Sequence, residues 1–215
     1  MIKISEMNLK IEDKTIFHNF QMKFKENQVY WLQGSNGSGK TTLFKVLAGL
    51  YLDHFHSSDN NAKIFYNQKL ISLSDFRNFT NYIPSEPYLF EYLTGQQNIN
   101  YLIQLFGLSN KHQSIMQMLN DFNLTSSLER MVKDYSLGMK AQLYLSVVLH
   151  RDKKIHLIDE IINSLDKLSQ EIFFSFISNK VNESNTTVVI TSHSQLETTI
   201  NYEILNLQKD SEGKI

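Results

Sequence analysis

The sequence contains no cysteine and only two prolines among its 215 residues. The absence of cysteine excludes disulfide bonds and thiolate chemistry, and it fits a reducing compartment. No apolar stretch approaches the ~20 residues that span a bilayer, and charges interrupt every apolar run near the N-terminus, so we expect neither a membrane span nor a signal peptide. The formal net charge of −1 gives no electrostatic reason to expect nucleic acid as a partner.

The most informative pattern that is present is a loop that fits G-x-x-x-x-G-K-[ST]. Its glycines let the backbone turn tightly and present N–H groups to phosphate oxygens, while the lysine adds positive charge and the hydroxyl can bind Mg²⁺. A buried strand is expected before it, over residues 28–32, and a helix after it, over 42–50, so the phosphates would lie at a helix N-terminus. The loop predicts a nucleotide site formed by Gly34, Ser35, Asn36, Gly37, Ser38, Gly39, Lys40 and Thr41, with Thr41 also at the metal.

A second pattern is a hydrophobic strand, residues 155–158, that ends in the acids Asp159 and Glu160. Such a strand carries its carboxylates to the edge of the sheet where nucleotide sites form in open α/β proteins. One carboxylate can hold Mg²⁺ through water, and the other can polarise the water that attacks the γ-phosphate. Two acids at a strand end are common on protein surfaces, but the phosphate loop upstream favours the functional interpretation.

The order of the expected elements indicates a mixed α/β sheet interrupted by helices. Strands are expected over 1–9, 20–24, 62–67, 81–83, 187–191 and 203–207, and helices over 137–149 and 168–181. Between them, apolar residues recur at helical spacing from residue 94 to about 130. We therefore expect a helical subdomain over residues 88–135, inserted into a core formed by residues 1–87 and 136–215, and a polar surface loop over 54–61.

Three further motifs complete a recognisable set. Tyr135-Ser-Leu-Gly-Met-Lys-Ala-Gln142 resembles the signature sequence of the ABC ATPases, Ser164-Leu-Asp166 resembles their D-loop, and Thr191-Ser-His193 resembles their switch histidine. Each motif is weak alone, because Ser136 could simply cap a helix and His193 could be an ordinary loop histidine. The order and spacing of all five motifs nevertheless agree along essentially the whole chain. The sequence therefore resembles the ATP-binding subunits of ABC transporters.

The resemblance implies a role for each matching residue. Lys40, Thr41 and Thr42 would bind the phosphates and Mg²⁺, with Asp159 supporting the metal, and Glu160 would be the general base. His193 would hold the γ-phosphate. The remaining implied contacts come from a second subunit, because family members close head-to-tail around two ATP molecules; its residues would include Ser136, Gly138 and the D-loop Asp166.

Two positions depart from the family pattern. The slot that usually holds an aromatic residue for stacking on adenine is occupied by Ile11, which offers apolar contact without a π-stack. The residue after Pro84, usually glutamine, is Ser85, followed by Glu86. Either can offer an oxygen ligand to Mg²⁺, but with a different reach.

The resemblance implies a P-loop NTPase of the ABC type, a single domain over residues 1–215. It implies that the chain hydrolyses ATP with a second ATP-binding subunit, expected to be an identical chain, and drives an integral membrane permease from the cytoplasmic face of the membrane. The signature variant and Leu93-Thr-Gly-Gln-Gln-Asn98 are more similar to exporters of peptides, lipids or drugs than to importers. Two alternatives are a soluble ABC ATPase that acts on nucleic acid or ribosomes and a P-loop kinase or GTPase.

Overall fold

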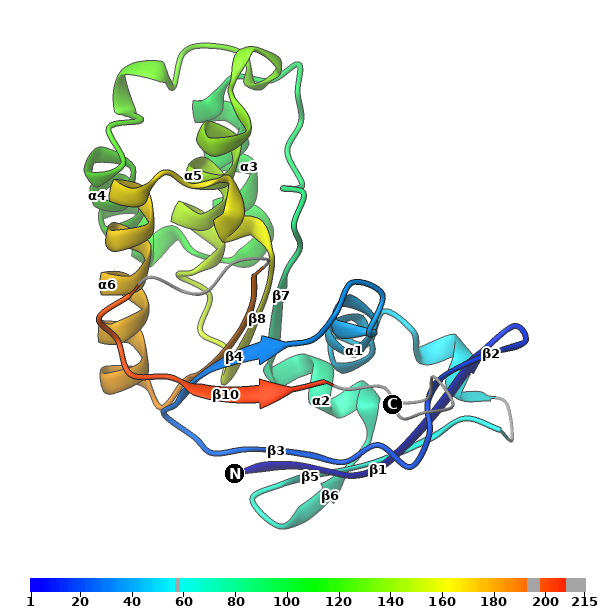
Figure 1. Cartoon of the computed structure of the whole chain (residues 1–215). Helices are drawn as coiled ribbons and strands as arrows, with labels where there is room; N and C mark the ends of the chain where they lie inside the picture. The colour runs from blue at the N-terminus through cyan, green and yellow to red at the C-terminus, as the bar shows by residue number, and fades with distance from the viewer. Residues whose placement is uncertain (57–58, 193–197, 208–215) are drawn as a thin grey trace.

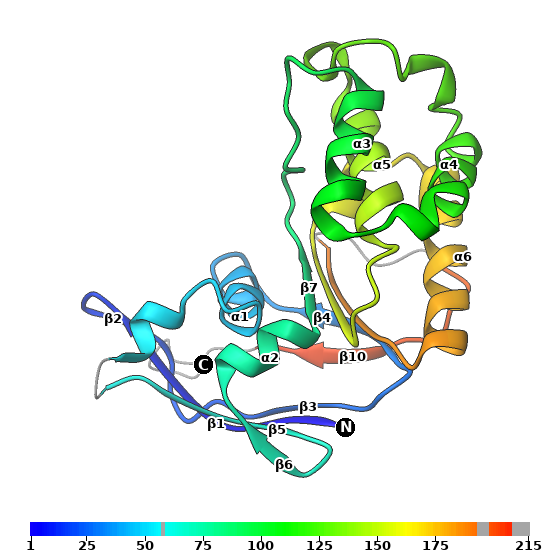
Figure 2. The same cartoon turned by 180° about the vertical axis from the view of Figure 1, so that it is seen from behind.

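Two β-sheets form the framework of the residues that the structure, a computed structural model, describes: 1–56, 59–192 and 198–207 (Figures 1 and 2). The first sheet is antiparallel, with strand order β2-β1-β5-β6 and β3 paired to the other end of β1. Its strands are β1 (Ile2–Ile11), β2 (Lys14–Phe17), β3 (Met22–Phe24), β5 (Asn61–Tyr66) and β6 (Lys69–Ile71).

The second sheet is parallel throughout and has the order β10-β4-β9-β8-β7. Because its strands run in the same direction, the loops that follow them emerge at one edge of the sheet. Every residue of β8 and β9 is buried, as expected for central strands covered on both faces. The strands are β4 (Val29–Gln33), β7 (Thr80–Ile83), β8 (Ile155–Asp159), β9 (Thr187–Thr191) and β10 (Glu203–Asn206).

Six α-helices connect and cover these sheets in the described part of the chain. Among them, no helix is long and apolar enough to cross a membrane. α5 packs against both α3 and α4, and the three stand together in the upper layer of Figure 1. The helices are α1 (Lys40–Leu47), α2 (Leu73–Phe79), α3 (Gly95–Phe106), α4 (His112–Asp121), α5 (Leu137–Val148) and α6 (Lys167–Ser184).

The parallel sheet separates two hydrophobic cores, because successive side chains of a strand point to opposite faces. Along β4, Trp31 belongs to the core shared with α3 to α6, whereas Leu32 belongs to the core that contains α1, α2 and the antiparallel sheet. β9 divides in the same way, with Ile190 in the first core and Val189 in the second. The parallel sheet therefore lies between α3 to α6 on one face and the phosphate-loop helix α1 on the other.

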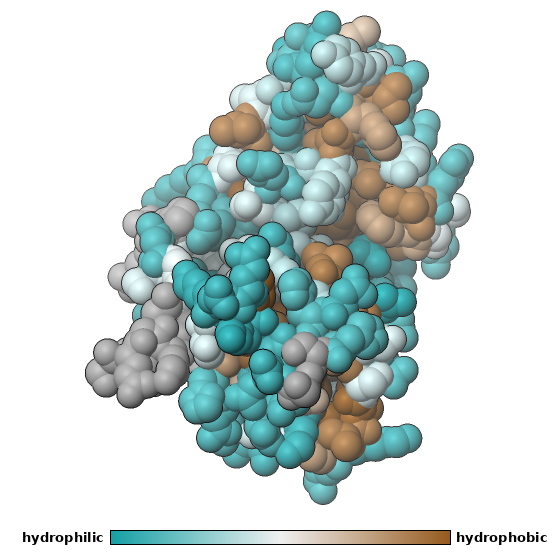
Figure 3. All heavy atoms as spheres, turned by 90° about the vertical axis from the view of Figure 1, so that its right-hand side faces the viewer, coloured by the Kyte–Doolittle hydropathy of each residue, from teal (hydrophilic) through white to brown (hydrophobic). Residues whose placement is uncertain are grey.

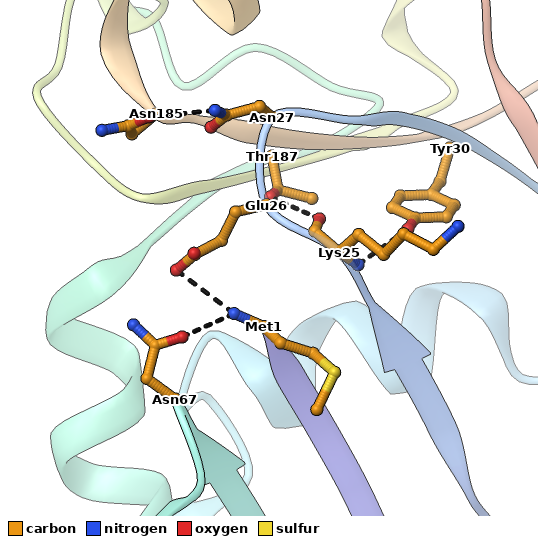
Figure 4. A network of polar contacts seen from close by, with 8 residues as sticks. All are labelled: Met1, Lys25, Glu26, Asn27, Tyr30, Asn67, Asn185 and Thr187. Carbon is orange, nitrogen blue, oxygen red and sulfur yellow. Dashed lines mark hydrogen bonds and ion pairs between the residues drawn. The ribbon is translucent and has the colours of Figure 1, made fainter.

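The turn between β3 and β4 joins the two sheets (Figure 4). The Lys25 carbonyl accepts a hydrogen bond from Thr187 Oγ1 at 3.0 Å, and the Lys25 N–H donates to the Tyr30 hydroxyl oxygen at 2.7 Å. Asn27 Nδ2 donates to Asn185 Oδ1 at 2.9 Å, next to the start of β9. These contacts fix the entry to β4, and with it the start of the strand that carries the phosphate loop.

The α/β class and the alternation of strands and helices are confirmed. The strands expected in one mixed sheet form two sheets, one antiparallel and one parallel, and three elements were not expected. β2 and β6 are short hairpin partners, and α2 follows β6 immediately. A local signal for α2 exists, since Ser72 Oγ caps the helix by accepting from the Asp75 N–H at 3.0 Å. The expectation of a simple surface loop over 54–61 is wrong, because a 3₁₀ helix occupies Leu52–His56 and Asn60 is buried, where its Oδ1 accepts from the Lys10 N–H at 2.6 Å.

Two histidines of the described part of the chain are buried: His150, just after the C-terminus of α5, and His156, within β8. His150 is only 6% exposed; its Nδ1 lies 2.8 Å from the Ser146 carbonyl oxygen, and its ring packs on Phe176. Burial lowers the pKa of His150 to about 4, although the hydrogen bond to Ser146 opposes the shift. Burial also lowers the pKa of His156, which is fully enclosed. Both histidines are therefore neutral in the folded protein at neutral pH.

The depressed pKa of His150 predicts a pH-dependent stability. The unfolded chain binds a proton near pH 6.5, whereas the folded chain does so only near pH 4, so the stabilisation is complete above 6.5 and is lost as the pH falls toward 4. We expect His150→Asn, whose amide can still donate to Ser146, to reduce the fall in unfolding free energy between pH 7 and 5 by about 1–2 kcal/mol. Denaturant titrations at several pH values measure this, and identical pH slopes would contradict it.

Candidate nucleotide-binding site

The phosphate loop connects β4 to α1 and depends on glycine conformations. Gly37 has φ +74° and Gly39 has φ +90°, in the left-handed region that side chains disfavour. Gly39 caps α1 without any side-chain hydrogen bond, and its carbonyl accepts from the Leu43 N–H at 2.7 Å. The N–H groups of the first helical turn are therefore available to an anion at the positive end of the helix dipole.

The loop borders a cavity of about 400 Å³. Gly34 sits where the chain is crowded, since a Cβ there would collide with Ser38 Oγ and would lie 2.7 Å from the Leu207 carbonyl oxygen. Besides the phosphate loop, the lining takes residues from β2 and one acid from the end of β8. The lining residues are Lys14, Thr15, Ile16, Asn36, Gly37, Ser38, Gly39, Lys40, Thr41, Thr42 and Glu160.

Two polar groups of this lining fit an anionic ligand. Lys40 is only 8% exposed, and its ammonium donates to the carbonyl oxygens of Gly34 at 2.8 Å and Ser35 at 3.2 Å. The hydroxyl of Ser38 is buried and has no hydrogen-bond partner among the described residues. A buried hydroxyl without a partner is costly, and a phosphate oxygen is an acceptor that would satisfy it. The residues present therefore fit a phosphate group.

The carboxylate of Asp159 is held from both neighbouring strands. Thr191 Oγ1 on β9 donates to Asp159 Oδ1 at 2.8 Å, and the Tyr82 hydroxyl on β7 donates to Oδ2 at 3.2 Å. Burial, together with the negative charge of Asp159, raises the pKa of Tyr82 and keeps it a hydrogen-bond donor. Asp159 itself is 2% exposed, so its orientation is fixed before any ligand binds.

Glu160 follows in an unusual backbone conformation. Its φ of +58° places a residue that has a side chain in the left-handed region, a form of strain that persists when the surroundings impose it. Its N–H lies 3.1 Å from Thr191 Oγ1 and 3.2 Å from the Thr191 carbonyl oxygen. The turn places Glu160 in the lining of the phosphate-loop cavity. Thr191 thus positions both acids at once.

The structure brings together only part of the predicted site. Ile11 ends β1 and is partly buried against the core that contains α1; the apolar residue that lines the cavity is Ile16 on β2. Ser85 follows β7 and is exposed outside the cavity lining. Ser136, at the start of α5, is likewise outside that lining. His193 lies outside the described residues, so its predicted role stays a prediction.

The signature segment and the D-loop form helix N-termini that are linked to each other. Ser136 Oγ caps α5 by accepting from the Met139 N–H at 3.2 Å, and Asp166 Oδ1 caps α6 by accepting from the Ser169 N–H at 2.8 Å. The hydrogen bonds from Ser169 lower the pKa of Asp166. Ser169 Oγ in turn accepts from Gln142 Nε2 at 2.8 Å.

Close backbone contact between the same segments requires Gly138. A Cβ at this position would lie 2.9 Å from the Ser164 carbonyl oxygen, in the segment that leads to Asp166. The signature helix and the D-loop are therefore one packed unit on the helical side of the sheet.

Sequence reasoning missed Thr191 and Tyr82 as supports of Asp159, as well as the lining residues on β2. The strands of Thr191 and Tyr82 were located, whereas β2 was not, and the alignment of parallel strands that sets Thr191 opposite Asp159 is a long-range property. The position of Thr191 at the last residue of its strand was the only available signal.

The comparisons with known proteins agree with this geometry. A family model described as ABC transporter matches residues 17–163. The lantibiotic transport ATP-binding protein SrtF of Streptococcus pyogenes is 32% identical over 197 residues, which cover 90% of this chain and 80% of SrtF. The bacitracin transport ATP-binding protein BcrA of Enterococcus faecalis is 26% identical, with 90% of this chain and 61% of BcrA covered.

Solved structures show the same fold. An ATP-binding subunit of an ABC transporter superposes with a TM-score of 0.74 at 21% identity and covers 90% of this chain and 80% of its own. A dimeric ATP-binding cassette in a post-hydrolysis state, bound to ADP and Pi, gives a TM-score of 0.71 at 18% identity, with coverage of 90% and 88%.

The fold and the site thus define an ATPase with an ABC-type nucleotide-binding domain. The chain belongs to the ABC transporter family, as an ATP-binding subunit that uses ATP and Mg²⁺ and hydrolyses the nucleotide.

The role of Thr191 leads to a first test of the site. Thr191→Val keeps the shape of the side chain but removes the hydroxyl that binds Asp159 and the Glu160 N–H, so we expect turnover to fall about 10- to 100-fold with ATP affinity little changed. Thr191→Ser should restore most of the activity. Thr186→Val is the matched control, because its hydroxyl, just before the same strand, bonds to the carbonyl oxygens of Lys153 and Ser184. Steady-state ATPase kinetics measure the effect; equal losses in the two valine variants would contradict it.

Proposed function

We propose that the chain works as one half of a head-to-tail pair of ATP-binding subunits that drives an exporter through a separate membrane permease. Membership of the family and the names of its relatives, which refer to lantibiotic, bacitracin and multidrug transport, support export of a peptide, lipid or drug. The chain would then be cytoplasmic and attached to the membrane through the permease. The match to transport proteins favours this function over an ATPase that acts on nucleic acid or ribosomes.

The single observation that carries the catalytic proposal is the position of Glu160 in the same cavity lining as the phosphate loop. Lys40 and the N–H groups of α1 bind and orient the phosphates, and Ser38 donates its free hydroxyl to them. Thr41, Thr42 and Asp159 provide oxygen ligands that would hold Mg²⁺, which supplies electrostatic stabilisation of the transferred phosphoryl group. Glu160 takes the proton from the attacking water, Ser85 would offer an oxygen ligand to the metal, and His193 would hold the γ-phosphate.

The separation of the signature from the phosphate loop supports a shared site. Ser136 and Gly138 lie outside the cavity lining of their own chain, yet the α5 N-terminus provides N–H groups and a positive dipole that suit a phosphate. In the proposed dimer this N-terminus, with Asp166 beside it, closes over ATP held by the partner. The nucleotide would then hold the two chains together.

A groove of about 710 Å³ between α2 and α3 supplies the proposed docking site for the permease. Tyr88 is 67% exposed and Phe90 50% exposed, and both line the groove together with Tyr101 and Leu105 of α3. Figure 3 shows hydrophobic side chains gathered on the upper half of this side of the molecule, at the level of the helical layer. Exposed aromatic side chains around a concave surface suit an apolar face of a short partner helix.

If Glu160 is the general base, its replacement should impair ATP hydrolysis without impairing ATP binding. Glu160→Gln should bind ATP with near-normal affinity, lose about 10²–10⁴ in turnover, and accumulate as an ATP-bound dimer because hydrolysis no longer releases the pair. Titration calorimetry, ATPase assays and light scattering measure the three properties. Glu129→Gln, an exposed acid of the helical layer, is the control. Turnover that stays at the wild-type level would remove Glu160 from this role.

If the groove binds the permease, changes in its lining should impair assembly with the permease without impairing ATP hydrolysis. Replacing both Tyr88 and Phe90 by serine should leave basal ATPase activity intact and abolish co-purification with the permease, since these side chains are exposed. Tyr92→Ser is the matched control: Tyr92 is 79% exposed in the same segment but lies outside the groove lining. Unfolding of the double variant, or equal loss of co-purification in the control, would contradict the docking role.

A further inference from the structure

One arginine in the docking groove is fixed in place by neighbours from distant parts of the chain. The guanidinium of Arg151, which follows α5, lies over the ring of Phe106 at 4.2 Å from its centroid. Arg151 Nη1 donates to Asn81 Oδ1 on β7 at 2.6 Å. Lys180 Nζ on α6 donates to the Arg151 carbonyl oxygen at 3.3 Å. The side chain is therefore held against the groove wall in a defined orientation.

The charge of this guanidinium has no carboxylate partner among the described residues. The described lining of the groove contains Arg77, Arg151 and Lys153 and no acid. Asp152, the next residue in the chain, pairs instead with Lys111 at 3.8 Å. Arg151 is partly buried, and this burial lowers the pKa of its guanidinium. Charges in such positions are ordinarily compensated by an opposite charge.

We propose, building on the docking function above, that the permease segment which fills this groove carries a carboxylate that pairs with the Arg151 guanidinium. The planar fork of arginine can bind a carboxylate with two parallel hydrogen bonds, and a fork that is already oriented loses little freedom when it does so. The aromatic side chains around it contact the apolar face of the same segment. A recessed, oriented cation of this kind suits a side chain that enters the groove better than it suits a flat anionic lipid surface.

The proposed ion pair would reach the nucleotide site through one side chain. Asn81 accepts from Arg151 and stands directly opposite His156 in the parallel pairing of β7 and β8. Its Nδ2 lies 2.9 Å from His156 Nδ1 and donates to the Val148 carbonyl oxygen at 2.9 Å. These strands end at Ile83, just before Ser85, and at Asp159. A ligand in the groove would therefore act on β7 and β8, the two strands that lead to Ser85 and Asp159.

The permease is first identified as the membrane protein that co-purifies with the tagged wild-type chain, and it is placed in nanodiscs. The affinity of the chain for these nanodiscs is then measured at several salt concentrations. Arg151→Gln should weaken binding about tenfold or more and flatten the salt dependence. Arg151→Lys, which keeps the charge, should retain part of the affinity. Lys153→Gln is the matched control, because Lys153 is another cation of the groove but its Nζ bonds to the Asn78 carbonyl; its affinity should change less than about threefold. The melting temperature and basal ATPase activity of each variant report whether it is folded.

Neutralising each Asp and Glu of the cytoplasmic segments of the permease in turn tests the proposal independently of how Arg151 variants fold. One such change should weaken binding as much as Arg151→Gln does and should cause no further loss of affinity when combined with it. The same change should abolish stimulation of ATPase activity by the permease. The proposal is overturned if no single acid matters or if the losses add. It is also overturned if the chain binds phosphatidylglycerol vesicles without permease in an Arg151-dependent manner. Failure of the wild-type chain to bind any permease would instead overturn the proposed function itself, and this inference with it.

Discussion

The parallel pairing of β4, β9 and β8 is the constraint on which the nucleotide site depends. The phosphate loop follows β4, Thr191 ends β9, and Asp159 ends β8, so the strand order places the threonine between the phosphate loop and the acids. Thr191 Oγ1 then donates to Asp159 and accepts from the Glu160 N–H. A shift of register by one residue would turn these side chains to the opposite face of the sheet and separate them. The chemistry is thus set by hydrogen bonds between strands before any loop conformation matters.

The same sheet divides the molecule into two cores with different tasks. Below it, α1 is packed between the two sheets, which fixes the helix whose N-terminus supports the phosphate loop. Above it, α3 to α6 form a second core that carries the signature segment and one wall of the docking groove. Arg151, Asn81 and His156 form a polar connection across the boundary between the helices and the sheet. A movement of the helical layer would reach β7 and β8 through these three side chains.

Local sequence patterns predicted the phosphate loop and the acidic end of β8, because each depends on a few adjacent residues. The fold class also followed from the order of strands and helices. β2, β6 and α2 were missed because they are short and gain their stability from neighbouring elements. The contacts of Thr191, Ile16 and Arg151 could not be predicted, since they arise only when distant segments meet; Arg151 and Asn81 are 70 residues apart. The adenine slot assigned to Ile11 shows the same limit, because alignment along the chain does not decide which of two adjacent hairpin strands faces the cavity.

The central claim is that the site is completed by the N-terminus of α5 from a partner chain. The chain has no cysteine, so one can be introduced at a single position without background reactivity. A chain with Asn36→Cys, in the phosphate loop, is mixed with a chain with Leu137→Cys, which is 73% exposed beside Ser136. A short bis-maleimide reagent should link the two into a covalent dimer in ATP and not in ADP. Absence of the link in ATP, or an equal yield without nucleotide, would contradict the account.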